Sequence, residues 1–69
     1  MEIVYHFKYT GEPTPGMPAQ MFAYALSRSV AIDIIKDAFI TDLPDHKFNE
    51  DDWGITARKI FYGQYFFIQ

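Results

Sequence analysis

The sequence predicts a small α+β domain in which one helix packs on one face of an antiparallel sheet of three to four strands. Three observations support this prediction. Apolar and polar side chains alternate near the N-terminus, apolar residues recur at helical spacing in the middle, and two aromatic segments flank a glycine near the C-terminus. The length of 69 residues predicts a single domain over 1–69, and the preferred element order is ββαββ.

The first strand is expected over residues 3–10. Its apolar face carries Ile3, Tyr5, Phe7 and Tyr9, and His6 lies on the opposite face. A loop follows between Thr10 and Pro18, because three prolines and two glycines cannot continue a ladder or a helix there. Since proline restricts φ, we expect this loop to be semi-rigid.

Residues 19–26 are compatible with two interpretations. One is a long helix over 18–39, which would give the order βαββ, because apolar residues repeat at i+4 and alanine favours helix. The other is a second strand over 21–26, with Phe22 and Tyr24 alternating on one face. The alternating aromatics, followed by serines that cap a helix well, favour the strand.

The helix is then expected to begin at Ser27 or Ser29, because both serines are good N-caps. Its apolar stripe, which we expect to face the sheet, consists of Val30, Ala31, Ile34, Ile35, Ala38 and Phe39. Charged residues occupy the other side: Asp33, Lys36 and Asp37. Pro44 ends the helix, because proline restricts the preceding residue and has no N–H to donate.

An acidic segment over 42–52 follows the helix. Asn49 is placed to cap a short turn of acidic residues, and Trp53 is expected to hold that turn against the core. A divalent ion held by His46 and these carboxylates is the alternative, but the spacing matches neither an EF-hand nor a paired-histidine motif. We therefore expect no metal and no cofactor.

The last two strands, over 55–62 and 65–69, are predicted to form a hairpin with a two-residue turn at Gly63-Gln64. In this register one face carries Arg58, Ile60, Tyr62, Tyr65, Phe67 and Gln69, and the other carries Ile55, Ala57, Lys59, Phe61, Phe66 and Ile68. A single helix covers only one face of a sheet, so the second aromatic face is a candidate interaction surface. The candidate binding residues are Tyr62, Tyr65, Phe67, Ile60, Arg58 and Lys59. In the alternative, the acidic segment folds over this face with Phe48 and Trp53 and hides it.

Composition excludes several classes of function. The chain has no cysteine, no nucleophilic serine motif and no phosphate-binding glycine loop, so we expect a protein that is not an enzyme. A net charge of −3 with six Lys and Arg disfavours nucleic acid as a partner. Neither a signal peptide nor a span of about 18 apolar residues is present, so we expect a cytoplasmic protein that does not enter membranes.

These features favour a small, acidic, aromatic-rich protein-binding module that acts through the second sheet face, with another protein or a second copy of the chain as partner. A single-stranded nucleic-acid-binding module is the alternative, because bases stack on the aromatic side chains of sheets. In its size and its cysteine-free composition, the chain resembles small accessory proteins of bacteriophages and prophages. It also resembles them in its layout, which consists of two strands, a serine-capped helix and a closing hairpin. The helix contains Ser29-Val30-Ala31-Ile32-Asp33-Ile34-Ile35-Lys36. Some anti-CRISPR proteins are among these accessory proteins. The resemblance implies a modulator that binds a host protein complex, in defence or DNA metabolism, and blocks it without chemistry.

Overall fold

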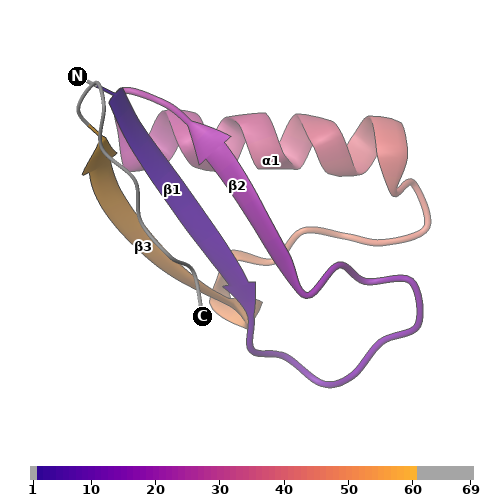
Figure 1. The fold of residues 1–69 in the computed structure, drawn as a ribbon. Coiled ribbons are helices and arrows are strands. Elements are labelled where there is room, and N and C mark those ends of the chain that lie inside the picture. Colours follow the sequence, from indigo (N-terminus) through magenta and orange to yellow (C-terminus); the bar gives the residue numbers. More distant parts are fainter. Residues whose placement is uncertain (1, 61–69) are drawn as a thin grey trace.

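A computed structural model of the chain describes residues 2–60 (Figure 1). Its elements are β1 (Glu2–Tyr9), β2 (Gln20–Tyr24), α1 (Arg28–Asp42), the 3-10 turn η1 (Glu50–Asp52) and β3 (Trp53–Ile60). The strands form an antiparallel sheet in the order β2-β1-β3, and α1 crosses one face of this sheet (Figure 1). The α+β class with one helix on an antiparallel sheet is confirmed. The predicted turn at Gly63-Gln64 and the strand after it lie outside the described residues.

The presence of β2 confirms the strand interpretation of residues 19–26 and rules out a long helix over 18–39. The strand pairs with β1 in a register that joins Val4 with Tyr24 and Lys8 with Gln20. One further backbone hydrogen bond extends this ladder at each end, from Tyr9 N to Ala19 O at 2.9 Å and from Ala25 N to Ile3 O at 3.1 Å. Residues 19–25 therefore complete a hairpin with β1 before the helix begins.

The loop between β1 and β2 contains a tight turn over residues 14–17. Met17 N donates to Thr14 O at 3.1 Å, and Gly16, which follows Pro15, has φ of 81°. Proline at the second position and a positive-φ glycine at the third define a type II turn. The proline-rich loop thus has a defined backbone conformation, as its composition predicts.

We expect Gly16→Ala to lower the free energy of unfolding by about 1–2 kcal/mol, because a Cβ disfavours positive φ. The new Cβ would also lie 3.1 Å from His46 Nε2. Urea denaturation followed by circular dichroism measures the change. Gly54→Ala is the matched control: a Cβ there meets nothing closer than 3.7 Å, so its stability should stay equal or rise slightly. Equal stability of both variants would contradict the turn conformation.

The helix begins at the first of the two candidate caps. Ser27 has extended backbone, and its Oγ accepts a hydrogen bond from Val30 N at 3.3 Å. The helix ends at Asp42, where Leu43 N donates to Phe39 O just before Pro44. Both boundaries follow from the serine and the proline that predicted them.

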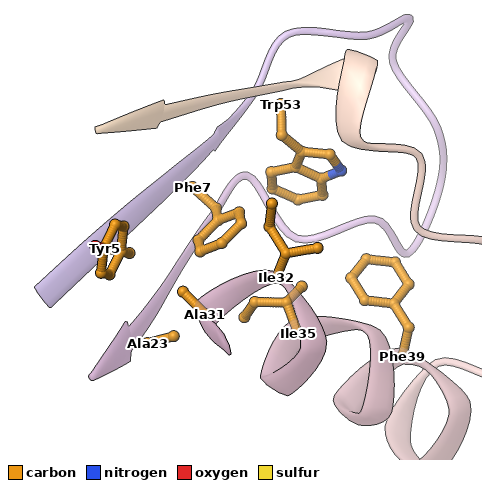
Figure 2. Packing of buried hydrophobic residues seen from close by; sticks show 8 residues of the cluster. All are labelled: Tyr5, Phe7, Ala23, Ala31, Ile32, Ile35, Phe39 and Trp53. Atoms are coloured by element: carbon orange, nitrogen blue, oxygen red, sulfur yellow. The ribbon is translucent and has the colours of Figure 1, made fainter. Parts of the chain in front are cut away.

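The core lies between α1 and one face of the sheet (Figure 2). Its buried members are Tyr5, Phe7, Ala23, Ala31, Ile32, Ile35, Phe39 and Trp53. The predicted helix stripe is correct for Ala31, Ile35 and Phe39, which are buried. It is wrong for Val30 and Ile34, which are 44% and 42% exposed, whereas Ile32, outside the stripe, is only 8% exposed.

The buried side of α1 is thus rotated away from the predicted stripe, and the aromatic residues that follow the helix explain this rotation. Phe48 and Trp53 pack against Phe39, with ring centroids 5.5 and 6.2 Å away, and extend the core along one side of the helix. Ile32 lies seven residues before Phe39 and therefore on the same side of α1. The helix buries the flank that faces these rings, and Ile34 on the other flank remains exposed.

The acidic segment adopts the predicted capped turn. Asn49 Oδ1 accepts a hydrogen bond from Asp51 N at 3.1 Å, and η1 ends at Trp53, which is buried. The Trp53 ring lies 5.1 Å from that of Tyr9 and 6.0 Å from that of Phe48. The expectation that Trp53 holds this turn against the core is confirmed.

Candidate interaction surface

The face of the sheet opposite α1 is the candidate interaction surface, and we call it the outer face. Tyr5, Phe7 and Ala23 belong to the core under the helix, so alternation along each strand places their neighbours on the other side. The register of the three strands assigns to the outer face Val4, His6, Lys8, Gln20, Phe22, Tyr24, Thr56 and Arg58.

Exposed apolar area on the outer face is concentrated on β2. Phe22 and Tyr24 are 47% and 64% exposed, whereas Val4 on the central strand is buried. Leu26, two residues beyond β2, is almost fully exposed. Large aromatic side chains that remain exposed at adjacent positions of one face are typical of a surface that binds a partner.

Phe22 is held in place by a polar neighbour. Its ring stacks on the imidazole of His6, with centroids 4.9 Å apart and an angle of 11° between the planes. With Nε2 as the donor, His6 in turn donates to Gln20 Oε1 at 2.7 Å. These contacts restrict the Phe22 side chain before any partner arrives, which lowers the entropic cost of binding.

Among residues 2–60, no strand lies beside the outer edge of β2. The bonds of Ile3 with Ala25 and of Tyr9 with Ala19 show that odd-numbered residues of this segment direct their polar groups towards β1. The N–H and C=O groups of Gln20, Phe22 and Tyr24 therefore point away from β1, and no other strand of residues 2–60 pairs with them. β2 contains no charge and no proline, the residues that usually protect an edge strand from pairing.

The two basic residues of the predicted binding site, Arg58 and Lys59, lie on opposite faces of the sheet. Arg58 is exposed on the outer face opposite Val4, whereas Lys59 pairs with Ile3 on the helix side. Residue 60 pairs with Glu2 at the end of the β1–β3 ladder. The remaining predicted residues, Tyr62, Tyr65 and Phe67, lie outside the described range.

The structure adds Phe22 and Tyr24 to the candidate surface. Their alternation was a signal that they share one face, but it did not indicate which face the helix would cover. The alternative in which Phe48 and Trp53 cover the second face is wrong. Both rings pack with Phe39, and Phe48 also lies edge-on to Phe7, so they belong to the helix side.

Two other kinds of feature are absent from the part of the chain that the structure describes. No three His, Asp or Glu side chains there come together in a group that could hold a metal ion. No helix among these residues has the length and apolar character needed to cross a bilayer.

Comparison with known protein families, with curated proteins and with solved structures gave no match.

Proposed function

We propose that the protein is a small non-catalytic binding module that attaches to another protein through the outer face and the open edge of β2. The observation that carries the proposal is the exposed pair Phe22 and Tyr24 on a strand whose outward backbone groups have no partner among residues 2–60. Aromatic anchors supply the binding energy, and an open edge supplies hydrogen bonds to an extended segment of the partner.

The biological setting in this proposal rests on the resemblance of the chain to small phage and prophage accessory proteins. A small, acidic, cysteine-free domain with an aromatic surface suits a phage- or prophage-type modulator that covers a functional surface of a host complex. Such a protein needs affinity and shape but no reacting groups. Lys8, which is exposed on the same face as the aromatics, would select acidic groups at the rim of the partner's surface.

Site-specific photo-crosslinking in a bacterial lysate tests the proposal. A photoreactive amino acid at position 24 should give a discrete product with a protein, and the same residue at position 34 should not. Ile34 is a suitable control because it is also an exposed large apolar residue but lies on the helix. Phe22→Ser should weaken capture about 30-fold, the loss typical of one aromatic anchor.

Three outcomes would contradict this function. Equal crosslinking from positions 24 and 34, or none from position 24, removes the outer face as a protein-binding surface. Salt-dependent binding of a single-stranded oligonucleotide, lost in Phe22→Ser, would establish the nucleic-acid alternative, because bases could stack beside the His6–Phe22 pair. Sedimentation of the purified protein at increasing concentration shows whether the chain binds a second copy of itself and not a host protein.

A further inference from the structure

A pocket of about 460 Å³ lies in the helix layer, between the second half of α1 and the segment that follows it. Figure 1 shows this segment leaving the end of α1 and returning beneath the helix towards η1. The pocket is lined from the helix by Lys36, Phe39 and Ile40, and from the segment by residues 44 and 46–48. Its volume is within the range of about 300–1,000 Å³ that is usual for small-molecule sites.

The pocket combines a fixed apolar floor with an exposed apolar rim. Phe39 is buried and meets Phe48 edge to face at 5.5 Å, so the floor is part of the packed core. Ile40, by contrast, is 75% exposed although it lines the pocket, and Pro44 beside it is exposed as well. An apolar ligand body placed here would remove the Ile40 side chain from water, which favours binding.

The charge of the lining is opposite to that of the chain. The protein carries nine Asp and Glu against six Lys and Arg, yet two lysines and no carboxylate line the pocket. Arg28 pairs with Glu50, and neither Lys36 nor Lys47 forms an ion pair with a described carboxylate. Both ammonium groups are therefore available to a ligand.

His46 adds a polar side chain to the same lining. Its backbone is fixed by a hydrogen bond from His46 N to Leu43 O at 3.0 Å, and its Nε2 lies against Gly16 of the type II turn. No hydrogen bond joins its imidazole to another described residue. The ring nitrogens thus add hydrogen-bonding capacity beside the two lysines.

We propose that this pocket binds a small organic anion in which a carboxylate is attached to an apolar chain or ring, such as a medium-chain fatty carboxylate. The carboxylate lies between Lys36 and Lys47, and the apolar body covers Ile40 and the floor formed by Phe39 and Phe48. This site is in the helix layer and does not depend on the protein-binding function of the outer face.

Decanoate, used below its micelle concentration, is the probe, and decanol of the same chain length is the uncharged control. In titrations followed by amide ¹H–¹⁵N NMR, decanoate should shift the signals of residues 36–48 saturably and leave those of β2 unchanged. Decanol should bind at least five-fold more weakly, because it cannot pair with the lysines.

Variants of the lining residues test whether decanoate binds in this pocket. The double variant Lys36→Gln with Lys47→Gln should weaken decanoate binding about five-fold or more and leave decanol binding unchanged. Ile40→Glu should abolish decanoate binding, because it places a like charge on the rim, and the exposure of Ile40 means that the fold tolerates the change. Lys8→Gln, which removes an exposed lysine from the outer face, is the matched control and should bind normally.

Two results would overturn the proposal. The first is an absence of saturable shifts in residues 36–48. The second is equal binding of decanoate and decanol with no effect of the lysine variants, since the pocket would then be a general apolar surface. The photo-crosslinking at position 24 is independent of both results, so each proposal can fail alone.

Discussion

Phe7→Ala is expected to leave the domain largely unfolded at room temperature. Phe7 has no exposed surface, lies on the central strand and contacts Phe48 edge to face at 6.1 Å. Truncating a buried phenylalanine costs about 3–5 kcal/mol, through lost burial and the cavity that remains. In a chain of 69 residues a single hydrophobic core rarely supplies more than about 3–5 kcal/mol of stability, so this loss removes most of it.

Far-ultraviolet circular dichroism during urea denaturation measures the effect, and Phe22→Ala is the control. Phe22 is also a phenylalanine in the sheet, but it is half exposed on the outer face, so its truncation should cost about 1 kcal/mol or less. A Phe7→Ala variant that unfolds at the same urea concentration as the parent protein would show that Phe7 is not at the centre of the core.

Ile32→Ala should destabilise the protein much more than Ile34→Ala. Ile32 is buried in the cluster that also contains Phe39 and Trp53, and its truncation should cost about 2–4 kcal/mol (Figure 2). Ile34 is exposed, and because alanine is the better helix former its replacement should change stability by less than about 1 kcal/mol.

The same denaturation experiment on the two variants tests the rotation of α1. The pair is closely matched, since both residues are isoleucines within one turn of the same helix. If Ile34→Ala were the more damaging change, the apolar stripe expected from the sequence would be the buried one. Equal and small effects would indicate that the helix is only loosely packed on the sheet.

The sequence predicted the elements well because each is marked by local chemistry. Ser27 and Pro44 bound the helix, Asn49 caps the acidic turn, and the alternation of apolar residues in β1 identifies its buried face. These signals act through the backbone and the nearest neighbours, so they can be read without tertiary contacts.

What sequence reasoning missed depends on contacts between distant segments. The helix has apolar side chains on two flanks, and only the packing of Phe48 and Trp53 against Phe39 determines that Ile32 is the buried one. The alternation of Phe22 and Tyr24 likewise gave no indication of which face α1 would cover. The pocket beside Ile40 was missed as well, because residues 44 and 46–48 form its wall only after their segment folds back along α1.

The position of β1 at the centre of the sheet affects the order in which the chain can fold. β1 is synthesised before the other described strands, but its register with β3 joins Glu2 to Ile60, so the sheet cannot close until nearly the whole described chain has been synthesised. Closing so long a loop costs conformational entropy, and folding should be slow for a domain of this size. Until then Phe7 lacks part of its cover, and Trp53, the single tryptophan, enters the core in the closing step, so its fluorescence follows that step directly.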